Sequence, residues 1–158
     1  NKNNITYEKM YDLIKEKFSF HWHHFYIFLF AYCKRWRTYF GELEIFLIGH
    51  TVVLNSISNA TKQLKGVKSY TEKWMIDIQN EKYSGMNVMS ISEITGIPRA
   101  TVIRKVDYLL RNNYIGKNKN NLLIFKADDS NFKSLRKLQE ETLNDLSNLM
   151  TCTINEII

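Results

Sequence analysis

Proline, cysteine and glycine are scarce in this chain of 158 residues, which contains one Pro, two Cys and six Gly. Alanine is also uncommon, whereas Asn, Lys and Ile are abundant, as is typical of an AT-rich coding sequence. The two cysteines, Cys33 and Cys152, lie far apart in apolar or helical surroundings. This spacing favours a reduced pair over a disulfide. Because lysine is abundant in such an AT-rich coding sequence, part of the lysine count is background, and arginine is the more informative basic residue.

Long apolar runs are also lacking. The longest uninterrupted one, Phe25–Cys33, has nine residues, whereas a membrane helix requires about 20. No secretory signal or lipid acceptor is visible, so we expect a cytoplasmic protein that does not enter a membrane. The 44% hydrophobic and 13% aromatic content exclude a disordered tail and suffice for one core, or for a small domain plus an interface.

Motifs for catalysis are missing as well. There is no Gly-rich phosphate loop, no nucleophile elbow and no Cys-x-x-Cys pair. Glu42 and Glu44 lie two residues apart and face different ways on a helix, so they are better interpreted as first-turn charges. We expect no enzymatic activity.

The histidines form the one group that suggests other chemistry. His21 and His24 share a helix face, but His23 points away from it, and no acid or cysteine lies nearby at ligand spacing. Packed or interface histidines are favoured over a metal site. We therefore predict no metal and no other cofactor.

The segment from Ile91 to Phe125 carries the main signal. Ser92 is placed to cap a short helix, Gly96 suits the left-handed turn that ends it, and Pro98 suits the first turn of the next helix. That second helix, about Pro98–Asn112, has an apolar stripe at helical spacing. The stripe consists of Val102, Val106, Leu109 and Leu110, and the outward face of Arg99, Ala100, Ile103, Arg104, Asp107 and Arg111.

A hairpin is predicted next, with strands Tyr114–Lys117 and Leu122–Lys126 joined by the polar tip Asn118–Asn121. From Gly96 to Lys126, seven basic residues accompany one acid, a net charge of +6 that equals that of the whole chain. The basic residues are Arg99, Arg104, Lys105, Arg111, Lys117, Lys119 and Lys126. The positive charge of the protein therefore belongs to this segment.

The segment ISEITGIPRATV resembles the helix-turn-helix of bacterial transcriptional regulators, in which Ile91, Ser92, Gly96 and Val102 match the residues that pack the two helices together. The run RKVDYLLRNNYI resembles the passage from recognition helix into wing. The layout is closest to that of MarR-like winged regulators. This resemblance, which covers about 35 residues, implies a mainly α fold with a small β-hairpin wing, in which a winged helix-turn-helix domain is flanked by N- and C-terminal dimerisation helices.

The function implied is sequence-specific binding of double-stranded DNA by a homodimeric transcriptional regulator. The recognition helix would enter the major groove and the wing, about Tyr114–Lys126, would lie on the backbone. The candidate base-contacting residues are Arg99, Ala100, Thr101, Arg104 and Asp107. Lys105, Arg111, Lys117 and Lys119 are the candidates for phosphate contacts or for flanking the groove. The alternative is a winged-helix module that binds protein or RNA without operator specificity.

Three domains are expected: a helical dimerisation region over 1–41, the winged domain over 42–127 with an inserted helix at about 58–85, and a dimerisation helix over 128–158. In the first region, Thr6 is placed to cap a helix whose apolar positions are Tyr7, Met10, Tyr11, Ile14 and Phe18. A second helix, about 20–40, is apolar on most of its circumference, which predicts burial on more than one side.

In the central region, a helix over 42–57 is predicted to pack through Leu43, Phe46, Leu47 and Leu54. Residues 58–69 are expected to connect it to a helix over 71–82 that buries Trp74 and Ile78.

The last helix should begin with a cap from Asp128, Asp129 or Ser130. It carries two apolar stripes, where one would serve a monomer. One stripe contains Leu135, Leu138 and Leu149, and the other Leu143, Leu146, Met150, Ile154 and Ile157. Together with the aromatic second helix, these stripes predict a homodimer.

A small-molecule effector is left open. The aromatic residues that could line its cavity are better interpreted as core or dimer packing. They are Phe20, Trp22, Phe25, Tyr26, Trp36 and Tyr39.

Overall fold

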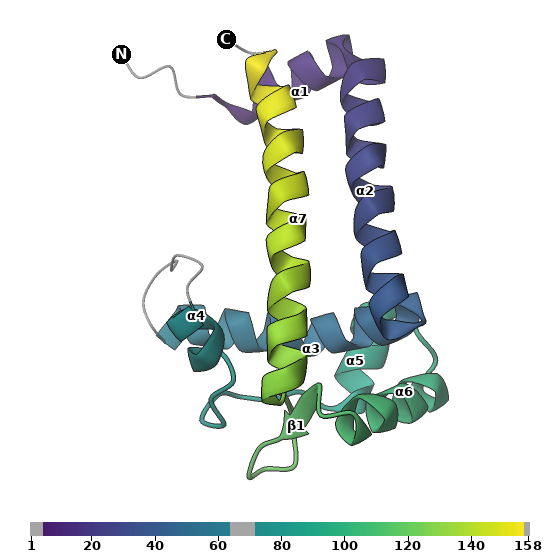
Figure 1. The fold of residues 1–158 in the computed structure, drawn as a ribbon, viewed down its shortest axis with the longest axis vertical. Coiled ribbons are helices and arrows are strands. Elements are labelled where there is room, and N and C mark those ends of the chain that lie inside the picture. Colours follow the sequence, from purple (N-terminus) through teal and green to yellow (C-terminus); the bar gives the residue numbers. More distant parts are fainter. Residues whose placement is uncertain (1–4, 64–71, 157–158) are drawn as a thin grey trace. The chain divides into compact units, whose positions relative to one another are not determined.

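The computed structural model describes residues 5–63 and 72–156. Its described part is mainly helical with one two-stranded antiparallel sheet (Figure 1), as the sequence predicted. The elements are α1 Tyr7–Glu16, α2 Phe18–Phe40, α3 Leu43–Gln63, α4 Glu72–Asp77, α5 Val88–Thr95, α6 Arg99–Arg111, β1 Ile115–Lys117, β2 Leu123–Phe125 and α7 Asp129–Asn155.

The chain divides into two compact units. The central unit is Trp36–Arg136, and the terminal unit combines Asn1–Arg35 with Lys137–Ile158. The sequence had placed the corresponding limits at residues 41 and 127. Two helices, α2 and α7, contribute to both units, because each has one end in either range.

In the terminal unit, α2 and α7 run side by side in opposite directions (Figure 1). Arg35 joins them, because its Nε donates to Glu141 Oε2 at 3.1 Å and its guanidinium also binds Asp145 and Thr142. Lys17, at the junction of α1 and α2, pairs with Glu156. Polar contacts therefore tie the two helices together at both ends of the unit.

The terminal unit has almost no core of its own. Among its described residues only His21 and Thr142 are buried. The predicted burial of α2 on several sides is wrong within a single chain, since Trp22 is 41% and Phe30 is 70% exposed. The apolar face predicted for α1 is only partly covered, because Met10 and Ile14 are half-buried and Tyr7 and Tyr11 are exposed.

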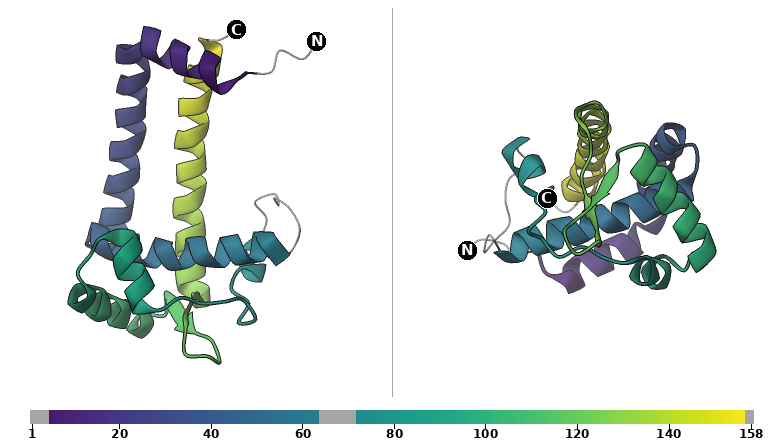
Figure 2. Two further views of the ribbon diagram at one scale, coloured as in Figure 1. Left: turned by 180° about the vertical axis from the view of Figure 1, so that it is seen from behind. Right: turned by 90° about the horizontal axis from the view of Figure 1, so that it is seen from below.

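The central unit has the main core. There α3 contacts α5, α6 and β2. Figure 2 shows α3 crossing the unit with α5 and α6 toward one end and the hairpin below its middle. The hydrophobic residues of this unit with at most 1% exposure are Trp36, Ile48, Val52, Ala60, Ile78, Ile91, Val102, Leu109 and Ile124.

The predicted packing face of α3 needs correction. Phe46 is buried as expected, but Leu43, Leu47 and Leu54 are exposed by 38%, 45% and 63%. The buried positions are instead Ile45, Ile48, Val52, Ser56 and Ala60. Because α3 is apolar around most of its circumference, helical spacing alone did not single out the right face.

The connection expected over 58–69 is wrong for residues 58–63, which continue α3, while 64–69 lie outside the described residues. Helix α4 is shorter than the predicted 71–82. Ile78 is 1% exposed, as predicted, and forms a second cluster with Ala60, Tyr83 and Phe125. Trp74 packs against this cluster and is half-buried.

Strands β1 and β2 confirm the predicted hairpin in a shorter form, with Gly116 paired to Ile124. Met86 forms a further antiparallel bridge with Leu123, in which each backbone N–H donates to the other's carbonyl at 2.9 Å. The residue before Met86 must be glycine, because a Cβ at Gly85 would lie 2.7 Å from the Leu123 oxygen. The segment immediately before α5 is thus hydrogen-bonded to the hairpin.

Helix α7 begins as predicted, with an acidic cap: Asp128 Oδ1 accepts from Asn131 N at 2.8 Å. Its two apolar stripes differ in burial. Leu135, Leu138 and Leu149 are half-buried. The described members of the other stripe, Leu143, Leu146, Met150 and Ile154, are 36% to 53% exposed, and Ile157 lies outside the described residues.

Within the described residues, no helix alone has the length and apolarity to cross a membrane. The bent pair formed by residues 18–40 and 43–62 does pass that test, on length and composition only.

Candidate nucleic-acid interface

Helices α5 and α6 are joined by a tight turn. Asn87 caps α5, because its Oδ1 accepts from Ser90 N at 2.9 Å. The predicted cap at Ser92 is therefore wrong: Ser92 lies inside α5, and its hydroxyl donates to Ile97 O at 2.7 Å. Gly96 ends α5 in the left-handed conformation (φ 69°), as predicted. Ser92 thus stabilises the turn between α5 and α6 instead of capping the start of α5.

Helix α6 buries three of the four residues of its predicted apolar stripe, whereas the fourth, Leu110, is half-buried. Val102 and Leu109 are fully buried and Val106 is 5% exposed. The exposed residues of α6 are Arg99, Ala100, Ile103, Arg104, Asp107, Tyr108 and Arg111, whereas Thr101 is half-buried. The predicted outward face of the helix is confirmed, and it carries three guanidinium groups.

Lys105 departs from its predicted role. Its side chain is 3% exposed and pairs with Glu42 and, at 3.1 Å, with Glu44. Burial alone would lower the pKa of Lys105, but the two carboxylates together raise it above its ordinary value, and the pKa of Glu42 is lowered by the same contact. Lys105 therefore stands inside the central unit and is not free to neutralise phosphate.

Helical geometry contains the signal that was missed for Lys105. It follows Val102 by three positions and precedes Leu109 by four, so it shares the inward face of α6 with both. Glu42, just before α3 and 63 residues away from Lys105, and Glu44 in the first turn of α3 compensate the charge that this position buries.

Two further basic residues have carboxylate partners. Arg111 lies 3.6 Å from Asp107 one turn earlier, with both side chains largely exposed, and Lys126 pairs with Glu81. Exposed pairs of this kind are weak and break readily when a stronger anion approaches.

Four cations of the segment form no ion pair with the described residues, although the charge of Arg104 contributes to the lowered pKa of Glu42. In residues 5–63 and 72–156, no ion pair involves Arg99, Arg104, Lys117 or Lys119, and all four are exposed. Two belong to α6 and two to the hairpin. This placement gives the central unit a cationic surface built from two adjoining elements.

The hairpin tip is held by one side chain. Asn118 is 8% exposed, and its Oδ1 accepts from the backbone N–H groups of Asn120 and Leu122 at 3.0 and 3.1 Å. Its Nδ2 donates to Tyr83 O at 3.3 Å. The sequence had suggested only a polar tip, and nothing in it distinguished Asn118 from Asn120 or Asn121.

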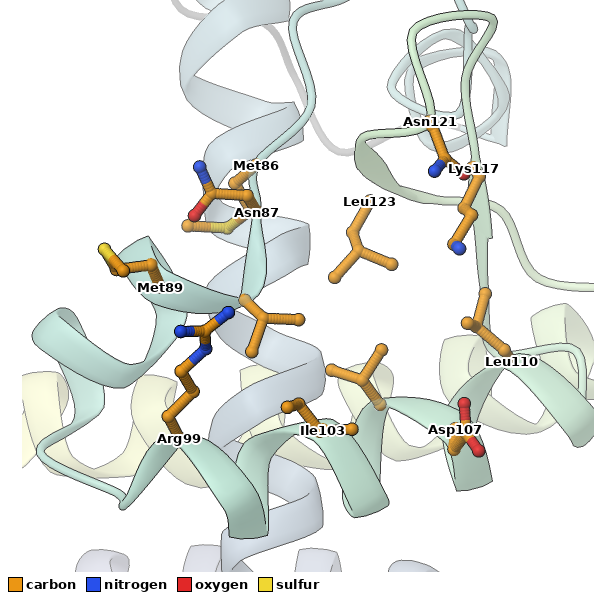
Figure 3. Close-up of a pocket in the computed structure, with 12 residues that line it drawn as sticks. Met86, Asn87, Met89, Arg99, Ile103, Asp107, Leu110, Lys117, Asn121 and Leu123 are labelled. Atoms are coloured by element: carbon orange, nitrogen blue, oxygen red, sulfur yellow. The ribbon is translucent and has the colours of Figure 1, made fainter.

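A hollow of about 510 Å³ lies between α6, the start of α5 and the hairpin (Figure 3). Its floor is apolar, with Met86, Leu110 and Leu123 among its residues. Figure 3 shows Arg99 and Ile103 on α6, with Lys117 and Asn121 on the hairpin opposite. Arg99 and Lys117 thus border this concave surface, which Asp107 also lines.

Comparison of the chain with protein-family models, with curated proteins and with solved structures found no match.

The other predicted sites are distributed differently. Trp36 is 1% exposed and stacks on Phe46 with ring centres 5.1 Å apart, so it is a core residue. Phe20, Trp22, Phe25 and Tyr26 are 37% to 42% exposed. Tyr39 contacts Tyr114 and is half-buried.

Among the described residues no group of three or more His, Cys, Asp or Glu is arranged to hold a metal ion, and Cys33 and Cys152 are both free thiols.

His50 lies in this same aromatic packing. Its ring is 4.5 Å from that of Trp36 and 4.1 Å from that of Phe46, and its Nδ1 donates to Phe46 O at 3.2 Å. Burial lowers the pKa of His50 to about 4, although the hydrogen bond to the carbonyl acts in the opposite direction. His50 is therefore neutral at physiological pH and serves as a packing residue.

Proposed function

We propose that this chain binds double-stranded DNA as a winged helix-turn-helix transcriptional regulator. The observation that carries the proposal is the set of four exposed cations without ion-pair partners in the described chain, Arg99 and Arg104 on α6 and Lys117 and Lys119 on the hairpin. Counterions released from phosphate are the main source of affinity for such a surface.

The order of elements supports the same proposal. From α3 to β2 the order is a long helix, the short helix α4, a bridge at Met86, two helices joined by a short turn, and a hairpin. In winged proteins this order presents the last helix to the major groove and leaves the hairpin for the flanking backbone. The sequence resemblance includes Ile91 and Val102, which are both fully buried between the helices, and Gly96, which ends α5 in the left-handed conformation.

The roles we assign follow from exposure. Ala100, Arg104 and Asp107 lie along the outward face of α6 and approach base edges, with Arg99 and Thr101 at its start. Arg111, Lys117 and Lys119 contact phosphate. Lys105 is a positioning residue, because its pairing with Glu42 and Glu44 fixes α6 against α3.

We further propose that the protein acts as a homodimer through the terminal unit. Eleven large apolar side chains of α2 and α7 there are 36% to 70% exposed. At about 150–250 Å² for each fully buried aromatic side chain, they offer on the order of 800 Å² per copy, the area of a standard interface. The residues are Phe18, Phe20, Trp22, Phe25, Tyr26, Ile27, Phe30, Leu143, Leu146, Met150 and Ile154.

A second copy is the occupant that this surface fits. From Phe18 to Cys33, α2 contains no Asp, Glu, Lys or Arg, so a partner gains nothing from charge and must supply apolar area. An identical apolar face meets that need by two-fold symmetry. A dimer would present two recognition helices to half-sites about one DNA turn, ~34 Å, apart.

The test is a titration of labelled duplex with the full chain at several salt concentrations. With about 0.9 counterions released per phosphate neutralised, the three phosphate contacts assigned to Arg111, Lys117 and Lys119 predict a slope of log K against log salt of about −3 for each recognition unit. Binding that is independent of salt, or absent from every duplex at low ionic strength, would refute the proposal. Tighter binding to RNA, or to a protein partner at all salt concentrations, would favour the alternative module.

A further inference from the structure

Ile103 is an unusual residue for the surface on which it lies. It is 48% exposed and stands on α6 one turn after Arg99 and one turn before Asp107. It also lines the hollow that faces the hairpin (Figure 3). The neighbouring outward position, Ala100, is small and exposed and leaves the Ile103 side chain accessible.

Ile103 is not required by the core of the central unit. The inward face of α6 is complete without it, because Val102, Val106 and Leu109 are at most 5% exposed. A β-branched residue is also no better than a charged one for an exposed helix position. A role in packing therefore does not account for an isoleucine there.

The chemistry of the major groove does account for it. Guanine presents acceptors that suit Arg, whereas thymine is distinguished from cytosine by an apolar C5-methyl group and by an acceptor in place of an amino donor. Ile103 has no hydrogen-bonding group, so the feature of a base edge that it can contact favourably is that methyl group. Arg104, next along the chain, is exposed and available for an adjacent acceptor.

We infer that Ile103 is a specificity-determining residue that contacts the C5-methyl group of a thymine, and that the chain prefers thymine to cytosine at that position. This inference rests on the proposed DNA-binding function and assigns to it a preference that charge alone does not give.

The test begins with a duplex selected from random sequence by the full chain. Each thymine is then replaced singly by deoxyuridine, which removes one methyl group and keeps every base pair. At one position we expect the affinity of the unchanged protein to fall about fourfold, the effect of exposing one buried methyl-sized group. In Ile103→Ala the same replacement should have no effect, which is a double-mutant cycle between protein and base.

Ile94→Ala is the matched control. Ile94 is a 66% exposed isoleucine on α5 that does not line the hollow, so its variant should keep the fourfold loss. The inference is overturned if no thymine is sensitive, or if the sensitivity persists in Ile103→Ala. Failure to bind any duplex would instead refute DNA binding itself, so the two failures are distinguishable. If Ile103 instead belonged to a patch for a protein partner, DNA would still bind in a salt-dependent way, but its affinity would not depend on any thymine methyl group.

Discussion

Arg104 and Lys119 are both exposed and form no ion pair within the described chain, but they carry different groups. The guanidinium of Arg104 is planar and suits two acceptors of one guanine, whereas the ammonium of Lys119 is a point charge that suits phosphate. At the scale of single residues, we therefore expect Arg104 to determine the preference for a base and Lys119 to determine the affinity for DNA of any sequence.

Arg104→Ala should cost about 1 to 3 kcal/mol on a selected duplex and relax the preference at one base pair. Lys119→Ala should weaken binding to selected and random duplexes alike and reduce the salt slope by about one. Fluorescence anisotropy on the two duplexes at several salt concentrations measures both effects. Equal losses on both duplexes for both variants would contradict the assigned roles.

The sequence predicted which side chains of α6 are exposed, because helical spacing alone determines it. It did not predict the partners of Lys105, since these depend on where α3 lies. It also misplaced the cap of α5, because Ser92 and Asn87 are both good capping residues, and the choice depends on how the chain leaves the bridge at Met86.

At the scale of elements, the hairpin depends on Asn118. This side chain satisfies two backbone N–H groups of the tip and donates to Tyr83 O. Asn118→Ala leaves these groups without partners, and we expect a loss of about 1 to 3 kcal/mol in unfolding free energy. Asn120→Ala, at an exposed position of the same tip, should change it little. Urea denaturation of both variants is the measurement, and equal losses would contradict the role of Asn118.

His50, on α3, makes the stability of the folded chain depend on pH. Its folded-state pKa of about 4 lies below its ordinary value of 6.5, so the unfolded chain binds a proton first as the pH falls. The contribution of neutral His50 to the free energy of unfolding is therefore fully present above pH 6.5, and it is lost as the pH falls from 6.5 to 4. At pH 5 the loss should be about 2 kcal/mol relative to pH 7.5.

His50→Leu should remove that pH dependence, because leucine does not titrate. The comparison is urea denaturation of both proteins at the two pH values. An unchanged dependence in the variant would show that another group is responsible.

The sequence predicted the limits of α2, α6 and the hairpin well, since these end at Gly41, at the Pro98 turn and at polar tips. It failed on the length and buried face of α3. There the chain is apolar on several sides and continues without a breaking residue, so only tertiary packing decides which face is covered.

At the scale of the whole molecule, the predicted dimer depends on the aromatic side chains of α2. Phe18, Trp22, Tyr26 and Phe30 follow at four-residue spacing, with successive ring centres 5.1 to 6.0 Å apart. Phe30→Lys places a charge at the most exposed of them, and symmetry doubles its effect. We expect the Kd of the dimer to rise on the order of 10- to 100-fold.

Light scattering at micromolar concentration tests this prediction. Leu54→Lys is the control, because Leu54 is 63% exposed on the central unit and should leave association unchanged. A wild-type protein that is monomeric at micromolar concentration would contradict the dimer itself.

The sequence indicated this association through the excess of apolar residues in both terminal helices. It did not reveal how little of the terminal unit a single chain covers. That depends on the side-by-side placement of α2 and α7, which leaves one stripe of α7 half-buried and the other exposed.

The buried amide of Asn118 also bears on the thermodynamics of recognition. Ordering a flexible loop on contact costs about 1 to 2 kcal/mol per residue in entropy. A tip already fixed by its own hydrogen bonds has met that cost during folding, so its ordering should add little to the entropic penalty of binding. In Asn118→Ala the penalty would return, and calorimetry would detect it as a less favourable binding entropy while the charges of the tip remain the same.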